Sequence, residues 1–367
     1  MKWKLEKVLS LVESSSIDVL IVTQPSNVTY LTGVAKSSGI TLVVEKNGST
    51  TALTPALDYW RVIDTTKLKE LVVVPYGVYQ LPDIDLKLVE PPHVYIPKML
   101  KEAGITKAAV DNPFGRIAFE VEKNLGTGVR DLSESIADLR SIKHYEEIEL
   151  MKKALSITER AVEKTVSELK PGMTEKYTAA VVEYYMKHLG ADGLAFESIV
   201  AFGSNAAYPH AAVTDRVLRE EDCVVLDVGA QFESYSSDLT RTVLIGSVDR
   251  EIKRAFEAVS EAVDSAIDSV YDGIAAHEVD GRAREVLRRA GLGKYFIHSL
   301  GHGIGIEVHE KPRLAQGSKD ILRDSMVVTI EPGVYIPGRY GIRIENMVLI
   351  RKSGAEVLNK LAKLLEV

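Results

Sequence analysis

The C-terminal two-thirds of the chain repeats its own order of elements at an offset of about 100 residues. A helical apolar period over 145–169 leads, after Pro171-Gly172, into a second helical segment and then into strand-like stretches at 198–202 and 223–228. The same order returns in the segments 249–271, 276–290, 303–308 and 326–330. Chance similarity between two ordinary helix–helix–strand units is the alternative. The repeat predicts an α+β domain with internal pseudo-two-fold symmetry.

A smaller α/β domain is expected before the repeat. Short apolar runs alternate there with helical segments, and the candidate strands lie at 17–23, 40–45, 71–76 and 107–111. A chain of 367 residues is too long for one ordinary core and suits two domains. We therefore expect an N-terminal α/β domain over residues 1–130 and an α+β domain over residues 131–367.

Composition argues against several classes of partner and location. The net charge of −7 and the scattered basic residues speak against a nucleic-acid partner. No run of 18 apolar residues is present, and charged residues interrupt the N-terminal apolar run before it resembles an export signal. The single cysteine, Cys223, fits a reducing compartment. We expect a cytoplasmic protein with no nucleic-acid and no membrane partner.

Each copy of the repeat contains a hairpin with two acidic residues. In the first copy Asp227 and Asp238 are eleven residues apart, and in the second Glu331 and Glu345 are fourteen apart, around a Pro-Gly turn. Residues that flank such a turn can face each other across antiparallel strands, with Cβ atoms roughly 5 Å apart. Both hairpins are therefore expected to bring two carboxylates together.

Four carboxylates in apolar strand sequence need a neutralising charge. Unpaired carboxylates are costly to bury, and neighbouring ones repel each other. Two divalent cations would balance a charge of about −4 and leave a bridging hydroxide as the reactive group. Each acid alone has a structural alternative, since Asp238 for example could cap a turn or pair with Arg241. The four in mirrored positions predict a dinuclear hydrolytic site.

The string GHGIGIEVHE over 301–310 supplies two histidines. His302 is expected as a nitrogen ligand, because the adjacent glycines allow close backbone approach. The spacing of seven differs from that of HExxH zinc sites and places His302 and His309 on opposite faces of a straight strand. His309 is therefore expected to act on protons or substrate, with His210, 99 residues earlier, as its counterpart. An ordinary loop histidine is the alternative for His210, and His298 is a weaker candidate to line the site.

The acidic hairpins and the GHGIGIEVHE string together resemble motifs of the pita-bread metallopeptidase family, in its prolidase and aminopeptidase P branch. NVTYLTG at 27–33 is similar to the signature of the N-terminal domain of prolidase-like members. The resemblance implies a creatinase-like α/β domain followed by a pita-bread (creatinase/aminopeptidase-like) α+β catalytic domain. The matching strings of the catalytic part, in family order, are LRSIKHYEEI, FGSNAAYPH, LDVGAQFESYSSDLTRT, HSLGHGIGIEVHE, IEPGVY and GIRIEN.

The resemblance also implies the ligands of two divalent metal ions. Asp227 would bind one ion with both oxygens, and Asp238 and Glu345 would bridge the pair. His302 and Glu331 would hold the second ion, and Glu331 would also act as general base. One nitrogen and four carboxylates are compatible with Mn, Co, Fe or Zn.

Four further residues are implied around the substrate. His210 and His309 would contact the substrate and the tetrahedral intermediate. Arg313 and Arg343 are candidates for binding a neighbouring acid or the substrate carboxylate, and ordinary ion pairs are the alternative for both.

The function that the resemblance implies is metal-dependent hydrolysis of Xaa-Pro bonds in small peptides with proline at the second position. The compact chain and the Tyr208-Pro209-His210 string are more similar to prolidase, an Xaa-Pro dipeptidase, than to aminopeptidase P. Aminopeptidase P, which trims longer peptides, stays the alternative, as does a binding protein that keeps the fold without catalysis. A homodimer is also implied.

Overall fold

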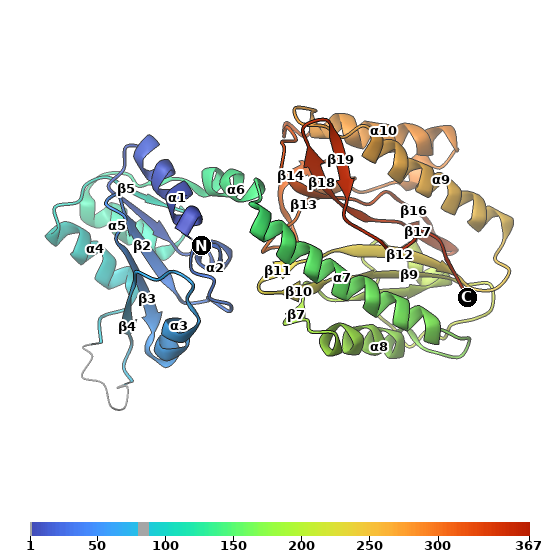
Figure 1. Ribbon diagram of the computed structural model, residues 1–367, viewed down its shortest axis with the longest axis horizontal. Helices are drawn as coiled ribbons and strands as arrows, with labels where there is room; N and C mark the ends of the chain where they lie inside the picture. Colours follow the sequence, from blue (N-terminus) through green and yellow to red (C-terminus); the bar gives the residue numbers. More distant parts are fainter. Residues whose placement is uncertain (1, 80–87) are drawn as a thin grey trace. The chain divides into compact units, whose positions relative to one another are not determined.

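The computed structural model describes residues 2–79 and 88–367 (Figure 1). The chain divides into two compact units, Met1–Leu139 and Arg140–Val367. Within the described ranges, no helix combines the length and the apolar character needed to cross a membrane.

The N-terminal unit is built on one six-stranded mixed sheet with the strand order β4-β3-β2-β1-β5-β6. All four strands expected from the sequence are present as β1, β2, β4 and β5, whereas β3 and β6 were not foreseen. The strands are β1 (Val19–Val22), β2 (Thr41–Glu45), β3 (Thr50–Pro55), β4 (Leu71–Tyr76), β5 (Ala108–Val110) and β6 (Arg130–Asp131). The α-helices from the start of the chain to the unit boundary are α1 (Lys2–Ser14), α2 (Pro25–Thr32), α3 (Tyr59–Thr65), α4 (Pro92–Glu102), α5 (Arg116–Leu125) and α6 (Ser133–Ser141).

The C-terminal unit contains two pairs of helices and two larger sheets. The helices are α7 (Tyr145–Glu168), α8 (Glu175–His188), α9 (Arg250–Asp268) and α10 (Ala276–Arg289). One sheet contains β8 (Ile199–Phe202), β9 (Cys223–Val228), β12 (Leu239–Leu244) and β20 (Leu365–Glu366). The other contains β13 (Gly301–Gly303), β14 (Glu310–Leu314), β15 (Val327–Ile330), β18 (Asn346–Arg351) and β19 (Gly354–Val357). Short strands complete the unit: β7 (Gly193–Leu194), β10 (Ala230–Phe232), β11 (Tyr235–Ser236), β16 (Gly333–Ile336) and β17 (Tyr340–Arg343).

The predicted internal symmetry is present in the strand order. β12, β9 and β8 are neighbours in the first sheet, as β18, β15 and β13 are in the second, and all these pairs are antiparallel. Isolated bridges just before α8 and α10 also correspond, since Thr174 pairs with Val217 and Ala275 with Ile321. The C-terminal unit is therefore two copies of one helix–helix–strand arrangement.

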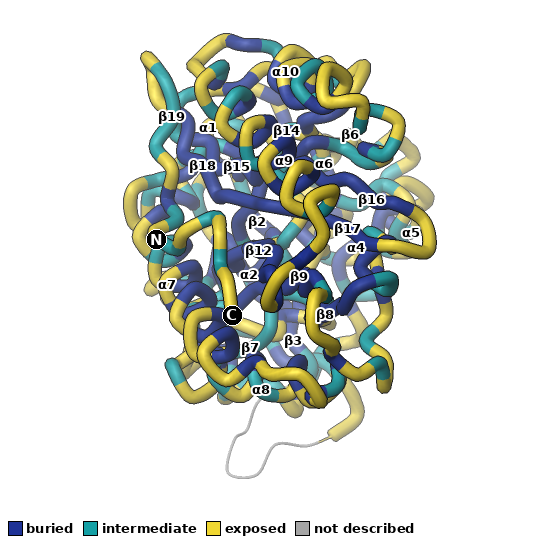
Figure 2. The backbone as a smooth tube through the Cα atoms, turned by 90° about the vertical axis from the view of Figure 1, so that its right-hand side faces the viewer, coloured by how far each residue is buried: buried dark blue, intermediate teal, exposed yellow. Residues whose placement is uncertain are grey.

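The two helix pairs cover opposite faces of these sheets (Figure 1). α7 and α8 pack on Val224, Leu226 and Val327, whereas α9 and α10 pack on Val225 and Val328. Successive residues of a strand point to opposite faces, so each central strand contributes to both cores. In Figure 2 the tube is dark blue along β12, β15 and β18, which are buried on both sides.

Two local signals determine where α8, the second helix of the first copy, begins. Gly172 lies in the connection between α7 and α8 and has a φ of 97°, a backbone conformation that glycine adopts without strain. The hydroxyl of Thr174 accepts a hydrogen bond of 3.1 Å from the backbone N–H of Tyr177, which confirms Thr174 as the N-cap of α8.

The expected strand over 303–308 is wrong. β13 ends at Gly303, and residues 304–309 form the bent connection to β14, with a register irregularity between His302 and Gly303. The strands approach so closely that a Cβ on Gly303 would lie 1.9 Å from the carbonyl oxygen of Lys311. The placement of His302 and His309 on opposite faces of a straight strand is therefore also wrong, because the chain turns between them.

Candidate metal centre

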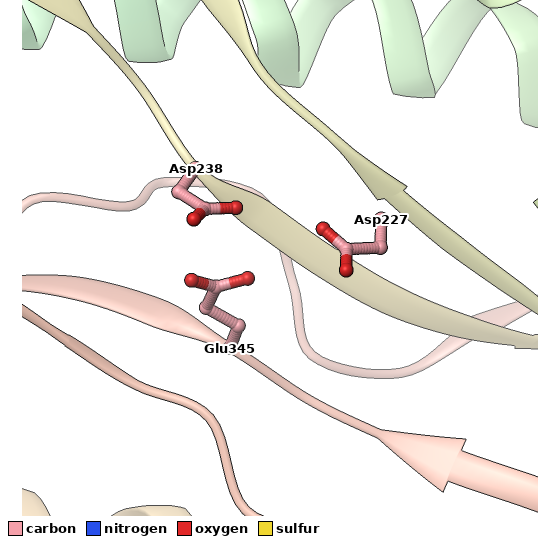
Figure 3. A group of neighbouring side chains, drawn as sticks. All are labelled: Asp227, Asp238 and Glu345. Atoms are coloured by element: carbon pink, nitrogen blue, oxygen red, sulfur yellow. The ribbon is translucent and has the colours of Figure 1, made fainter. Parts of the chain in front are cut away.

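Three carboxylates from both halves of the C-terminal unit meet at one point (Figure 3). Asp227 lies on β9, Asp238 directly precedes β12 and Glu345 directly precedes β18. One oxygen of each lies within 4.8 Å of the other two. Asp227 is the register partner of Thr240, so Asp238, two residues before Thr240, emerges on the same face of the sheet. This register brings the first acidic hairpin together as the sequence predicted.

Two of the three carboxyl groups are shielded from water, and the third, Asp227, is of intermediate exposure. Asp238 is 5% exposed and Glu345 is 1% exposed. Burial, followed by the charges of neighbouring acids, raises the pKa of Asp238 well above its ordinary value and that of Glu345 to about 8. Burial likewise raises the pKa of Asp227, against the opposing charge of Arg343. Burial and mutual repulsion therefore disfavour the charged forms of all three groups.

Two oxygens of this cluster lack the contacts that burial demands. Oδ1 of Asp227 and Oε1 of Glu345 are buried without a hydrogen-bond partner in the part of the chain that the structure describes. Buried polar atoms are ordinarily satisfied, and leaving a charged one unsatisfied costs more than leaving a neutral one. Unpaired oxygens in a cluster of carboxylates are the donors that a divalent cation requires, so these residues fit a metal site.

His302 and Glu331 complete the cluster. Nε2 of His302 lies 3.4 Å from Oε1 of Glu331 and 3.7 Å from Oδ2 of Asp238. Its Nδ1 lies 3.1 Å from the carbonyl oxygen of Gly303, and a hydrogen bond there leaves Nε2 free to act as a ligand. Burial disfavours the imidazolium, but Glu331 and Glu345 outweigh it and raise the pKa of His302. The structure thus brings all five predicted ligands together.

Arg343 points at the acids and not at solvent. Its Nη2 donates to Oδ2 of Asp227 at 2.5 Å, its Nη1 to the hydroxyl of Tyr335 at 2.7 Å, and its Nε to Oγ1 of Thr240 at 3.2 Å. Thr240 in turn donates to Oε2 of Glu345 at 2.8 Å. Of the two roles considered for Arg343, the geometry supports binding a neighbouring acid, because its donors are engaged with Asp227 and the groups around it.

Thr240 and Tyr335 were not singled out from the sequence. Thr240 stands two residues after Asp238, and this period-2 spacing within a strand is the signal that could have found it. Tyr335 gave no such signal. Its hydroxyl lies 2.9 Å from Nε2 of His298, so the hydrogen-bond network continues from Arg343 through Tyr335 to His298.

His309 lies against His302, and His210 is close enough for its charge to act on His309. The rings of His309 and His302 are 4.3 Å apart between centroids, in an edge-to-face arrangement. Partial burial, followed by the charge of His302, lowers the pKa of His309, and His210 contributes in the same direction. Both side chains are exposed. Two histidines from the two halves of the repeat therefore stand where a substrate can reach them.

Arg313 lies across the β13–β14 pair from His302. The two residues are register partners, so their side chains leave the same face of this sheet. Arg313 is exposed, and its backbone N–H donates to Asp320 at 2.7 Å. Arg313 therefore carries an exposed positive charge on the sheet face that also bears His302.

Comparison with known proteins identifies this arrangement. A sequence profile described as Metallopeptidase family M24 matches residues 149–352, more than half of the chain. A profile described as Creatinase/Prolidase N-terminal domain matches residues 4–142. The chain belongs to metallopeptidase family M24.

Relatives of this M24 protein are similar over their whole length. The protein from Pyrococcus furiosus named Xaa-Pro dipeptidase is 36% identical over 361 residues, which are 98% of each chain. Among solved structures, the prolidase from Pyrococcus horikoshii OT3 is 34% identical, with a TM-score of 0.86 over 98% of this chain and 99% of its own. The X-Pro aminopeptidase from Thermotoga maritima MSB8 is 30% identical, with a TM-score of 0.87 over 99% of both chains. The predicted family and fold class are confirmed.

The metal-free M24 cluster should make stability depend on pH. The unfolded Glu345 carboxyl loses its proton near the ordinary pKa, whereas the folded one retains it up to about 8. The folded state therefore binds more protons between these values and loses stability as the pH rises. In the presence of a chelator we expect the free energy of unfolding to fall by about 1–2 kcal/mol between roughly pH 6.5 and 8 because of this group, as measured by urea titration.

Glu345→Gln supplies the control, because the amide cannot titrate. Its unfolding free energy should change less over the same interval than that of the wild type. A wild-type unfolding free energy that falls no more steeply with pH than that of Glu345→Gln would contradict the burial of a repelling carboxylate.

Proposed function

We propose that the protein hydrolyses Xaa-Pro bonds in dipeptides as a metal-dependent peptidase. The observation that carries the proposal is the convergence of five ligands, with buried and unpaired carboxylate oxygens, in an M24 chain. Full-length similarity to proteins named Xaa-Pro dipeptidase supports the substrate class. The bond before proline is a tertiary amide without an N–H, which calls for a dedicated site.

The cluster is proposed to hold two divalent ions. Asp227 would bind one ion, Asp238 and Glu345 would lie between the two, and His302 and Glu331 would bind the other. When bound, such ions polarise the scissile carbonyl and lower the pKa of a water molecule so that it can attack. The ligand set accommodates Mn, Co, Fe or Zn.

The chain's own groups would handle the protons. Burial opposes ionisation of Glu331, but the hydrogen bond and charge of His302 outweigh it and lower the pKa of Glu331. Glu331 is then ionised near neutral pH and can accept a proton from the attacking water. The lowered pKa of His309 keeps its ring neutral at the same pH, so that an N–H can be donated to the developing oxyanion. His210 is proposed to contact the substrate from the opposite half of the repeat.

Arg313 is proposed to bind the free carboxylate of the substrate proline. It is exposed and shares a sheet face with His302, and a guanidinium binds a carboxylate through two parallel N–H donors. The positive charge of Arg313 would favour substrates whose free carboxylate belongs to the proline itself, and such substrates are dipeptides.

Aminopeptidase P is the second candidate, since the fold resembles the Thermotoga maritima X-Pro aminopeptidase as closely as it resembles the prolidases. A binding protein without catalysis is disfavoured, because all five ligand positions keep suitable residues. Assembly as a homodimer in the cytoplasm is also proposed, on the family resemblance.

Length preference is tested by assaying the metal-reconstituted protein on a Gly-Pro-type dipeptide, its C-terminal amide and Xaa-Pro-Yaa peptides. We expect the dipeptide to be the best substrate. Arg313→Met should raise KM for the dipeptide by about tenfold or more, because the dipeptide has a free carboxylate to bind. The KM for the amide, which has no such carboxylate, should change by less than about twofold. Efficient turnover of the longer peptides alone would contradict the dipeptidase proposal and favour aminopeptidase P.

Glu331→Gln tests the proton acceptor. We expect kcat to fall at least about a hundredfold, because the amide has nearly the same shape but accepts no proton. Metal content is measured on the same sample, so that a lost ion is distinguished from a lost base. The control is Glu251→Gln, which removes an exposed carboxylate that pairs with Arg339 at 2.8 Å and should leave kcat within about twofold. Full activity of Glu331→Gln would refute the mechanism.

A further inference from the structure

Glu310 directly follows His309 and takes no part in the metal cluster. Its carboxylate contacts the guanidinium of Arg140 through Oε1 and lies 3.0 Å from Nζ of Lys143 through Oε2. The side chains of these three residues are 6%, 7% and 1% exposed, respectively. Buried charges persist only when partners compensate them, so this is a specific three-membered contact and not a surface ion pair.

The two cations come from a part of the chain that is fixed to the sheet. The backbone N–H of Lys143 donates to the carbonyl oxygen of Ser325 at 2.9 Å, and Ile142 forms an isolated bridge with Met326, just before β15. Arg140 and Lys143 are 170 and 167 residues away from Glu310 in sequence. They therefore connect the loop 304–309, which precedes β14, to a segment that is distant in the sequence and hydrogen-bonded to the sheet.

The Glu310 carboxylate also closes the turn that carries His309. Its Oε1 accepts a hydrogen bond of 3.2 Å from the backbone N–H of Glu307. A Cβ on Gly305 would lie 2.7 Å from either carboxylate oxygen, so glycine leaves the room that this group occupies. The opposite side of the turn is held by Ser236, whose backbone N–H donates to the carbonyl oxygen of Gly305 at 2.7 Å.

The charge state of the contact is settled by its partners. Burial alone would favour the neutral acid, but Lys143 and Arg140 outweigh it and lower the pKa of Glu310 to about 2. The Glu310 carboxyl is therefore ionised over the whole pH range in which the enzyme would work. A neutral amide at position 310 would keep the shape of the side chain and remove this attraction.

We propose that Glu310, held by Arg140 and Lys143, is a positioning residue that sets the His309 ring against His302 at the metal centre. The proposal rests on the proposed function of His309, which directly precedes Glu310 in the turn that this contact closes. A small shift of a catalytic group can cost about a hundredfold in rate. The three buried charges would prevent such a shift.

The test compares Glu310→Gln with Glu307→Gln in metal-loaded protein. Glu307 is the matched control, because it lies in the same turn and contacts the same Arg140 at 2.9 Å, but its side chain is 54% exposed. We expect Glu310→Gln to lower kcat for a Gly-Pro-type dipeptide by about tenfold to a hundredfold with unchanged metal content, and Glu307→Gln to stay within about twofold.

A double-mutant cycle separates positioning from general destabilisation. If Glu310 acts through His309, Glu310→Gln should cost less than about twofold in a His309→Ala background, because the ring that it positions is absent. An equal loss in both backgrounds, or a Glu310→Gln variant with wild-type kcat, would overturn the proposal.

Amide hydrogen exchange gives a readout that needs no turnover. In Glu310→Gln the amides of residues 304–310 should exchange faster, while those of β15 and β18 are unchanged. Equal exchange in wild type and variant would refute the positioning role of Glu310, even if the proposed substrate is not hydrolysed. If Glu310→Gln fails to fold, two variants of Lys143 replace it. Lys143→Met keeps the Arg140 contact and should lower kcat, whereas Lys143→Arg keeps the charge and should retain kcat. Equal kcat of the two variants would contradict the proposal.

Discussion

The repulsion between buried carboxylates is the constraint on which the C-terminal unit depends. Asp227, Asp238 and Glu345 place oxygens within 4.8 Å of one another, with two of their oxygens unpaired. Such a cluster is unfavourable by itself and has to be imposed by the surrounding structure. The central strands impose it, because they are packed on both faces by helices and cannot move apart without opening two cores.

The internal repeat explains how one chain places acids on both sides of a point. Asp227 and Asp238 come from the first copy, and Glu331 and Glu345 from the second. Arg343 and Thr240 then connect the copies, since Arg343 binds Asp227 and Thr240 binds Glu345. The first copy alone would offer two of the five proposed ligands, and the second alone would offer three. The pseudo-symmetry is thus the means by which the fold forms the site.

Much of this was predictable from the sequence. Helical periods and stop signals located α7 to α10, and the apolar runs of β9 and β15 carried the acids into the core. The spacing of acids around two turns predicted their convergence, because strand register follows from the period of two. Periodicity and turn signals were sufficient to predict a contact wherever the two residues are close in the sequence or lie on strands joined by a turn.

The sequence failed where neighbours come from distant segments. The hairpin between β13 and β14 was expected as a straight strand, because an apolar run does not reveal the close approach of Gly303 to Lys311. Likewise Glu310 had no assignable role, because its partners Arg140 and Lys143 lie some 170 residues away. In both cases the deciding contact is tertiary and leaves no periodic trace in the chain.

Titration of chelator-treated protein with Mn²⁺ by calorimetry measures directly whether the carboxylate cluster is a metal centre. We expect binding of about two ions per chain, with release of protons near neutral pH because the pKa of Glu345, raised to about 8, keeps this group largely protonated without metal. Asp238→Asn, which neutralises a proposed bridging ligand, should reduce the stoichiometry or weaken binding by about tenfold or more. The absence of any Mn²⁺ binding by the folded wild-type protein, or binding unaffected by Asp238→Asn, would contradict the account.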